Sequence, residues 1–72
     1  MWQMKNNYKI YTNRAFAEIC KMYGSKAEFA RQINVDVSVL GASLKGKPVQ
    51  ASFVANALRR FGTPFDSLFE VR

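Results

Sequence analysis

The side chains that could carry out acid–base or nucleophilic chemistry are few in this sequence, and they lie far apart. There is no histidine, and Cys20 is the only cysteine, so no disulfide can form within the chain. Zinc sites are built mainly from Cys and His, so a structural zinc site is not expected. Two of the five carboxylates, Glu28 and Asp36, are placed to cap helices. The other three are widely spaced: Glu18, Asp66 and Glu70. Because no nucleophile has a neighbouring base, we expect neither catalysis nor a cofactor.

The basic side chains are the feature that most clearly indicates a partner. Eleven Lys and Arg residues outnumber five Asp and Glu, which gives a formal net charge of +6 and a pI near 9.9. This balance favours a polyanionic partner, with nucleic acid ahead of a membrane surface. No apolar run approaches the roughly 18 residues that span a membrane. The polar segment 1–12 lacks the apolar centre of a signal peptide.

The rest of the chain predicts an all-α fold, a compact bundle of about five short helices around one small core. Apolar residues make up 49% of the 72 residues and aromatic residues 14%, enough for a single core. Helices are predicted from a cap at Thr12 or Asn13 to residue 23, then over 26–33, 37–45 and 50–61, and from Thr63-Pro64 to 69, with apolar side chains at helical spacing. Residues 1–11 form an N-terminal arm, and 12–72 form the domain.

The stretch 25–46 has the residues of two short helices joined by a tight turn. A capping box, Ser-x-x-Glu, opens the first of these helices. Ala30 provides the small side chain needed where two helices cross closely. Asn34 tolerates the left-handed conformation that a sharp turn needs, and Asp36 caps the next helix. This order of residues predicts a helix-turn-helix.

The same residues resemble the Cro/repressor-type, or XRE-like, helix-turn-helix family of phage and bacterial regulators. The family pattern is approximately L-A-x-x-L-G-V-S-x-x-x-I, followed by a glycine, a Pro-containing loop, an apolar helix and a short "L-F" helix. The matching positions are Phe29-Ala30, Ile33-Asn34-Val35-Asp36, Leu40, Gly46, Pro48, Ala57-Leu58, Phe61-Gly62 and Leu68-Phe69. The match covers about Phe16 to Phe69, and the small size is similar to that of Cro-like phage members. The resemblance implies a lambda-repressor-like DNA-binding domain.

The function that this resemblance implies is sequence-specific regulation of transcription. A homodimer would bind a near-palindromic double-stranded DNA operator, with its third helix in the major groove. The protein would then act in the cytoplasm of a bacterial host cell, in association with the nucleoid, without a membrane or a small-molecule ligand. Two dimer surfaces are possible. The region of the fourth and fifth helices offers Val49, Phe65 and Val71, and the N-terminal segment offers Trp2, Met4, Tyr8 and Ile10.

The resemblance places the recognition helix at Val37–Lys45. It assigns base contacts to the outward positions Val37, Ser38, Gly41, Ala42 and Lys45. Ser38 could bond a base or a phosphate, while Val37 and Ala42 could contact thymine methyl groups. The Gln, Asn and Arg residues that usually contact bases are absent. Gly41 in mid-helix costs roughly 1 kcal/mol relative to Ala. Either it lets another segment pack closely, or it lets the helix lie deep in the groove.

Phosphate contacts are expected from lysines and from the first turns of the second and fourth helices, which flank the groove in the family. The expected residues are Ser25, Lys26, Arg31, Lys45, Lys47 and Ser52. Arg59 and Arg60, late in the fourth helix, are expected to have a structural role or to contact a dimer partner. The N-terminal arm either folds back on the domain or contacts DNA through Lys5, Asn6, Asn7 and Lys9.

A second hypothesis is a protein-interaction or antitoxin module that uses the same fold. The apolar residues Val37, Val39 and Ala42 on the third helix favour it, because an apolar helix face can also bind a partner protein. Substitution of Ser38 and Lys45 would separate the two hypotheses, since only a DNA-binding protein would lose its affinity for an operator.

Overall fold

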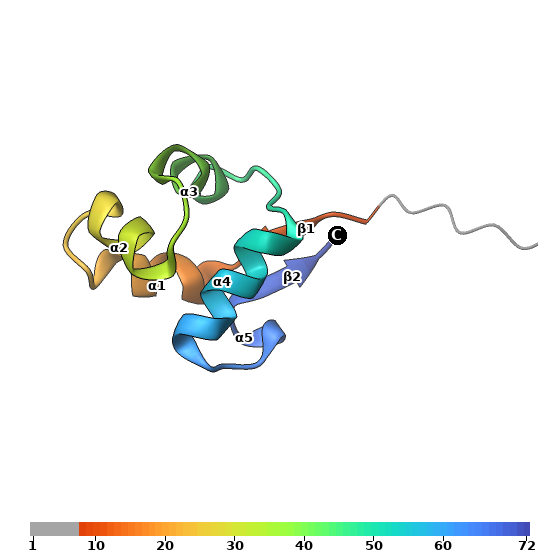
Figure 1. Ribbon diagram of the computed structural model, residues 1–72. Helices are drawn as coiled ribbons and strands as arrows, with labels where there is room; N and C mark the ends of the chain where they lie inside the picture. The colour runs from red at the N-terminus through yellow and green to blue at the C-terminus, as the bar shows by residue number, and fades with distance from the viewer. Residues whose placement is uncertain (1–7) are drawn as a thin grey trace, which may run out of the picture.

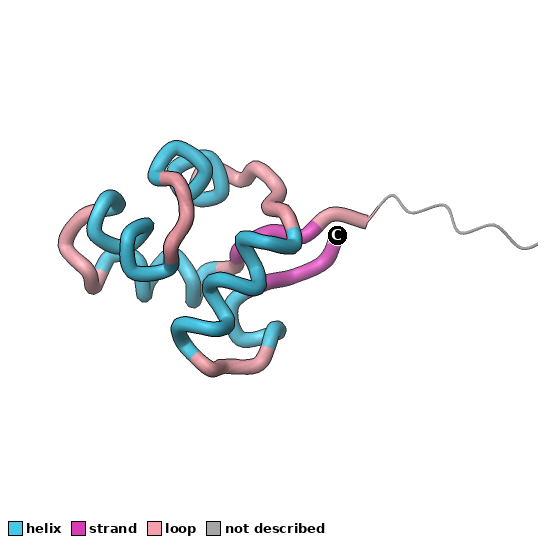
Figure 2. Tube along the Cα trace, in the orientation of Figure 1, coloured by secondary structure: helices cyan, strands magenta, loops and turns pink. Residues whose placement is uncertain are grey.

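The computed structural model describes residues 8–72 as five helices and one two-stranded sheet (Figure 1). Figure 2 shows that helices make up most of the chain and that the two strands lie side by side. The elements in chain order are β1 (Ile10–Thr12), α1 (Arg14–Lys21), α2 (Lys26–Ile33), α3 (Val37–Leu44), α4 (Ala51–Phe61), α5 (Phe65–Leu68) and β2 (Phe69–Val71).

The sheet corrects the prediction of an all-α fold: the protein is mainly helical, with a small antiparallel sheet. β1 pairs with β2 in a register that sets Ile10 opposite Val71 and Thr12 opposite Phe69. Ile10 also bridges Val49, whose N–H donates to the Ile10 carbonyl at 2.8 Å. Phe69 was expected to end the last helix and instead begins β2. A three-residue strand has too little alternation to be recognised in sequence, and its partner lies at the other end of the chain.

The pairing of β1 also changes two expectations, one for the N-terminal arm and one for Val49. β1 spans the predicted boundary between an arm over 1–11 and a domain over 12–72, so the last residues of the arm are part of the folded unit. Val49 was expected on a dimer surface but is only 8% exposed, because the bridge to Ile10 holds it in the core. The expectation that Val49 lies on an exposed surface is therefore wrong.

The helix bounds follow local capping chemistry. α2 has the predicted bounds: the Ser25 hydroxyl accepts the Glu28 N–H at 3.1 Å, and Asn34 closes the helix at a φ of 60°. Of the two predicted caps for α1, Asn13 is the one that accepts a first-turn N–H. α1 ends at residue 21 rather than 23, and α3 at 44 rather than 45. The predicted helices are thus placed to within two residues.

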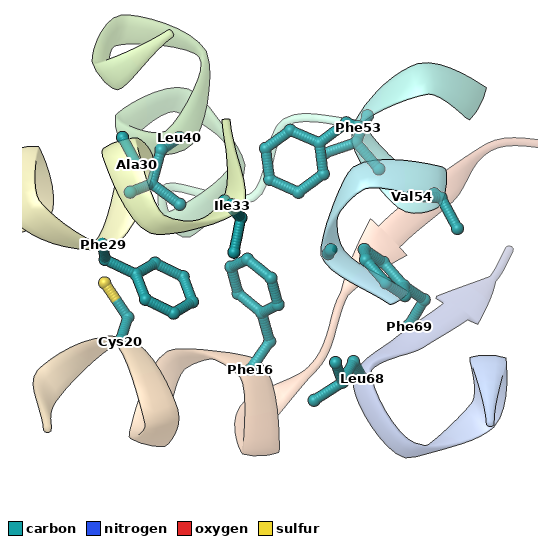
Figure 3. Packing of buried hydrophobic residues seen from close by; sticks show 12 residues of the cluster. Phe16, Cys20, Phe29, Ala30, Ile33, Leu40, Phe53, Val54, Leu68 and Phe69 are labelled. Carbon is teal, nitrogen blue, oxygen red and sulfur yellow. The ribbon is translucent and has the colours of Figure 1, made fainter. Parts of the chain in front are cut away.

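The core is built around the ring of Phe16 (Figure 3). This ring is fully buried, and its centroid lies 5.3 Å from that of Phe29, 5.7 Å from Phe53 and 5.7 Å from Phe69. Because these rings come from α1, α2, α4 and β2, one side chain joins four elements. The buried hydrophobic residues are Phe16, Cys20, Phe29, Ala30, Ile33, Leu40, Val49, Phe53, Val54, Ala57, Leu68 and Phe69.

Candidate nucleic-acid interface

Helix α3 is held against α2 and α4 by buried side chains and by the turn that precedes it. Leu40 points into the core from α3, and Ala30 is buried on α2. In the turn, the Val35 N–H donates to the Ala30 carbonyl at 2.9 Å. The Asn56 amide of α4 donates to the Asn34 carbonyl at 3.2 Å. These contacts fix the direction of α3, so its outward face is a defined surface.

The outward face of α3 carries all five residues that were expected to contact bases. Val37, Ser38 and Lys45 are exposed, whereas Gly41 and Ala42 are half-buried. Val39 was not among the predicted base contacts, yet Val37 and Val39 are both 46% exposed. The sequence feature that could have identified Val39 is its position one residue before Leu40, whose side chain points into the core. The face is therefore small and apolar, with one cation at its carboxyl end.

The first turn of α3 contains a carboxylate–hydroxyl pair. Asp36 Oδ1 accepts the Ser38 N–H at 2.9 Å and the Ser38 hydroxyl at 2.8 Å. These two hydrogen bonds hold the pKa of Asp36 below its usual range. A carboxylate can only accept hydrogen bonds, so the Ser38 hydroxyl proton is directed to Asp36. The Ser38 oxygen therefore offers acceptor lone pairs to any molecule in front of the helix.

Gly41 is not required by packing within the described residues. A Cβ placed on Gly41 would meet no other atom of this part of the chain within 4 Å. This contradicts the alternative in which Gly41 lets another described segment pack closely. The other interpretation, that the missing side chain lets α3 lie deep in a DNA groove, stays a prediction.

We predict that Gly41→Ala stabilises the free protein by about 0.5–1 kcal/mol, because alanine loses less backbone entropy in a helix. It should also weaken binding of the partner that lies against α3. Thermal unfolding measures the first effect and titration with DNA the second. Gly24→Ala is the matched control, because Gly24 has a φ of +86° that alanine adopts only with strain, so it should lower stability. A lower stability of Gly41→Ala would contradict the prediction.

The first turns of α2 and α4 adjoin opposite ends of α3. A hollow of about 440 Å³ is lined by Ser25 and Lys26 at the start of α2 and by Leu44 at the end of α3. A second hollow, of about 340 Å³, is lined by Val39 near the start of α3 and by Ser52 in the first turn of α4. The predicted phosphate contacts at the two helix starts therefore lie near the two ends of α3.

The two helix starts offer different hydrogen-bond donors to a ligand. At α2 the Ser25 hydroxyl accepts the Glu28 N–H, and its own proton can be donated outward. Gln50 precedes α4 and makes no side-chain capping bond, which leaves first-turn N–H groups of α4 uncapped. Gln50 and Asn56, which line the same hollow as Ser52, were not predicted as site residues. The one sequence signal for Gln50 was its place at the start of the fourth helix.

One predicted cationic contact is paired within the protein, and the backbone of a second is held by the sheet. Arg31 forms an ion pair with Glu28 at 2.5 Å. Glu28 also accepts the Gln32 amide at 2.9 Å, and the hydrogen bonds from Gln32 and Arg31 hold the pKa of Glu28 below its usual range. Lys9 exchanges backbone hydrogen bonds with Arg72 at 3.0 and 2.9 Å, which anchors it at the end of the sheet. The other predicted arm residues lie outside the described residues: Trp2, Met4, Lys5, Asn6 and Asn7.

Within residues 8–72, no helix combines the length and apolar character that a membrane span requires. Over the same residues, no three His, Cys, Asp or Glu side chains come together as a possible metal site. Cys20 lies in the core, and this burial raises the pKa of its thiol. The surface around α3 is therefore the candidate site with the most convergent features.

Comparisons of the chain with protein-family models, with curated proteins and with solved structures found no match.

Proposed function

We propose that the protein is a sequence-specific regulator of transcription that binds double-stranded DNA. In this proposal α2 and α3 form a helix-turn-helix, and α3 lies in the major groove. The observation that carries the proposal is the position of α3 between the first turns of α2 and α4. Backbone N–H groups at helix starts bind phosphates, and a helix between two such starts can contact base edges while both ends are held.

The distribution of unpaired charge supports the same function. Lys26, Lys45 and Lys47 are exposed, and none of them forms an ion pair in the part of the chain that the structure describes. Lys26 lies in the first turn of α2, and the two others follow α3 directly. Lysines without carboxylate partners can neutralise phosphates and release counterions. The expected result is a DNA affinity that falls steeply with salt.

Lys47→Gln tests this arrangement. Selection from a random pool should yield a preferred duplex. The affinity of the protein for this duplex should fall as salt rises, with a log–log slope near −0.9 per phosphate neutralised. Lys47→Gln should weaken binding to every sequence and reduce the magnitude of the slope by about 1. Arg14→Gln is the matched control, because Arg14 is an exposed cation at the start of α1 and outside the proposed interface, and it should leave the slope unchanged. Equal affinity of the unmodified protein for selected and random DNA would contradict sequence-specific binding.

We also propose a homodimer that pairs through β2. Backbone hydrogen bonds join Arg72 to Lys9 in both directions, so the main chain of the neighbouring Val71 points away from β1. Val71 is 53% exposed, whereas Phe65 stacks on Phe69 with ring centroids 5.5 Å apart. An open strand edge pairs readily with a second copy around a twofold axis. Sedimentation equilibrium with and without DNA measures the stoichiometry.

A protein-interaction module remains the second candidate, because Val37 and Val39 are both 46% exposed. A partner protein would bury these valines and would need no phosphate contacts. The double substitution of Ser38 and Lys45 by Ala and Gln should abolish operator binding if the first proposal is correct. Loss of a protein partner with unchanged DNA affinity would favour the second.

A further inference from the structure

We infer that the base pairs in front of the first turns of α3 are A·T pairs, recognised through the adenine amine and the thymine methyl group. This inference rests on the proposed DNA-binding function and names the class of sequence that the site would select. It depends on the direction of one hydroxyl proton and on the valines that surround it.

The polar atoms at the start of α3 are acceptors. The Ser38 hydroxyl donates to Asp36 Oδ1 at 2.8 Å, so its remaining hydrogen-bonding capacity is two lone pairs. Asp36 is an exposed carboxylate and can only accept as well. In the major groove, the bases that present an amine donor are adenine, at N6, and cytosine, at N4. The start of α3 therefore favours an amine-bearing base over guanine, which presents only acceptors there.

The apolar side chains distinguish adenine from cytosine. Val37 and Val39 are exposed on either side of Ser38, and Ala42 lies one turn further along the outward face. A thymine methyl group would bury itself against such side chains. An A·T pair presents both an amine and a methyl group in the major groove. A C·G pair also presents one amine and two acceptors, but it has no methyl group for the valines to bury.

No side chain on the first two turns of α3 offers a hydrogen-bond donor to the O6 and N7 acceptors of guanine. Lys45 is the one cation on the outward face, and it follows the last residue of the helix. Base contacts come mainly from the amino-terminal part of a recognition helix, so Lys45 is placed for phosphate. Arg31, on α2, is paired with Glu28. Thymine methyl groups should thus contribute directly to affinity.

Deoxyuridine substitution tests the inference, since it removes only the methyl group of thymidine. A duplex selected from a random pool is made with deoxyuridine at each thymidine of one half-site in turn. Each contacted methyl group should lower affinity by about fourfold, which corresponds to burial of one methyl-sized group at roughly 0.8 kcal/mol. Deoxyuridine in the flanking sequence is the control and should have no effect.

Ser38→Ala provides a second, independent measurement. It should relax the preference for adenine at one position of the half-site, a preference expected to be about fivefold in the unmodified protein, the worth of one neutral hydrogen bond. Ser52→Ala is the matched control in α4 and should weaken binding to all sequences equally. Selection of a G·C core, or deoxyuridine without effect on a selected site, would overturn this inference while leaving sequence-specific DNA binding intact. Failure to select any sequence would instead overturn the proposed function.

Discussion

Phe16→Ala is expected to lower the free energy of unfolding by about 3–5 kcal/mol, the usual cost of removing a buried phenylalanine side chain. Phe16 is fully buried and contacts rings from three other elements, so no single neighbour can move to fill the space. A chain of 72 residues is stabilised by roughly 4–11 kcal/mol in total. The substitution should therefore remove a large fraction of this stability.

Urea unfolding followed by circular dichroism measures this loss. Met22→Ala is the control, because Met22 is 81% exposed and surface substitutions usually change stability by less than about 0.5 kcal/mol. Phe16→Leu should lie between the two, since leucine retains most of the buried volume. A loss below about 1 kcal/mol for Phe16→Ala would show that the core is not organised around this ring.

The elements predicted best from the sequence are those that are determined by residues close to them in the chain. The hydroxyl of Ser25 and the left-handed conformation of Asn34 act within a few residues of their own position, and both bounds of α2 were correctly predicted. The sheet was missed because it joins Ile10 to Val71, and no local pattern indicates that pairing. Two further errors follow from the same missed strand pairing: the helix end placed at Phe69 and the assignment of Val49 to a surface.

The candidate site was predicted in outline and corrected in detail. Helical periodicity is enough to place Ser38 and Ala42 on the outward side of α3, because Leu40 must face the core. The bond from Ser38 to Asp36 depends on a rotamer, and the space around Gly41 depends on every neighbouring segment. Neither can be obtained from residue spacing, and both decide which chemistry the surface offers.

Ala42→Glu is expected to lower operator affinity by roughly 100-fold or more, because like charges brought together at an interface cost several kcal/mol. Ala42 lies on the outward face of α3, so in the proposed complex a carboxylate there would point toward the phosphate-lined groove. Glutamate is a good helix former, and the fold should be retained. DNA titration measures the loss, and circular dichroism confirms that the helices remain.

Ala15→Glu is the matched control for this substitution. Ala15 is exposed on α1, which lies on the opposite side of the core from α3 (Figures 1 and 3), so the same change in charge occurs away from the proposed interface. Its effect should be the few-fold loss caused by one unit of net charge. Equal losses from the two variants would contradict contact between α3 and DNA. Comparison with Lys47→Gln distinguishes DNA from a protein partner on α3. Ala42→Glu would disrupt either partner, whereas Lys47→Gln should weaken only a partner that carries phosphates.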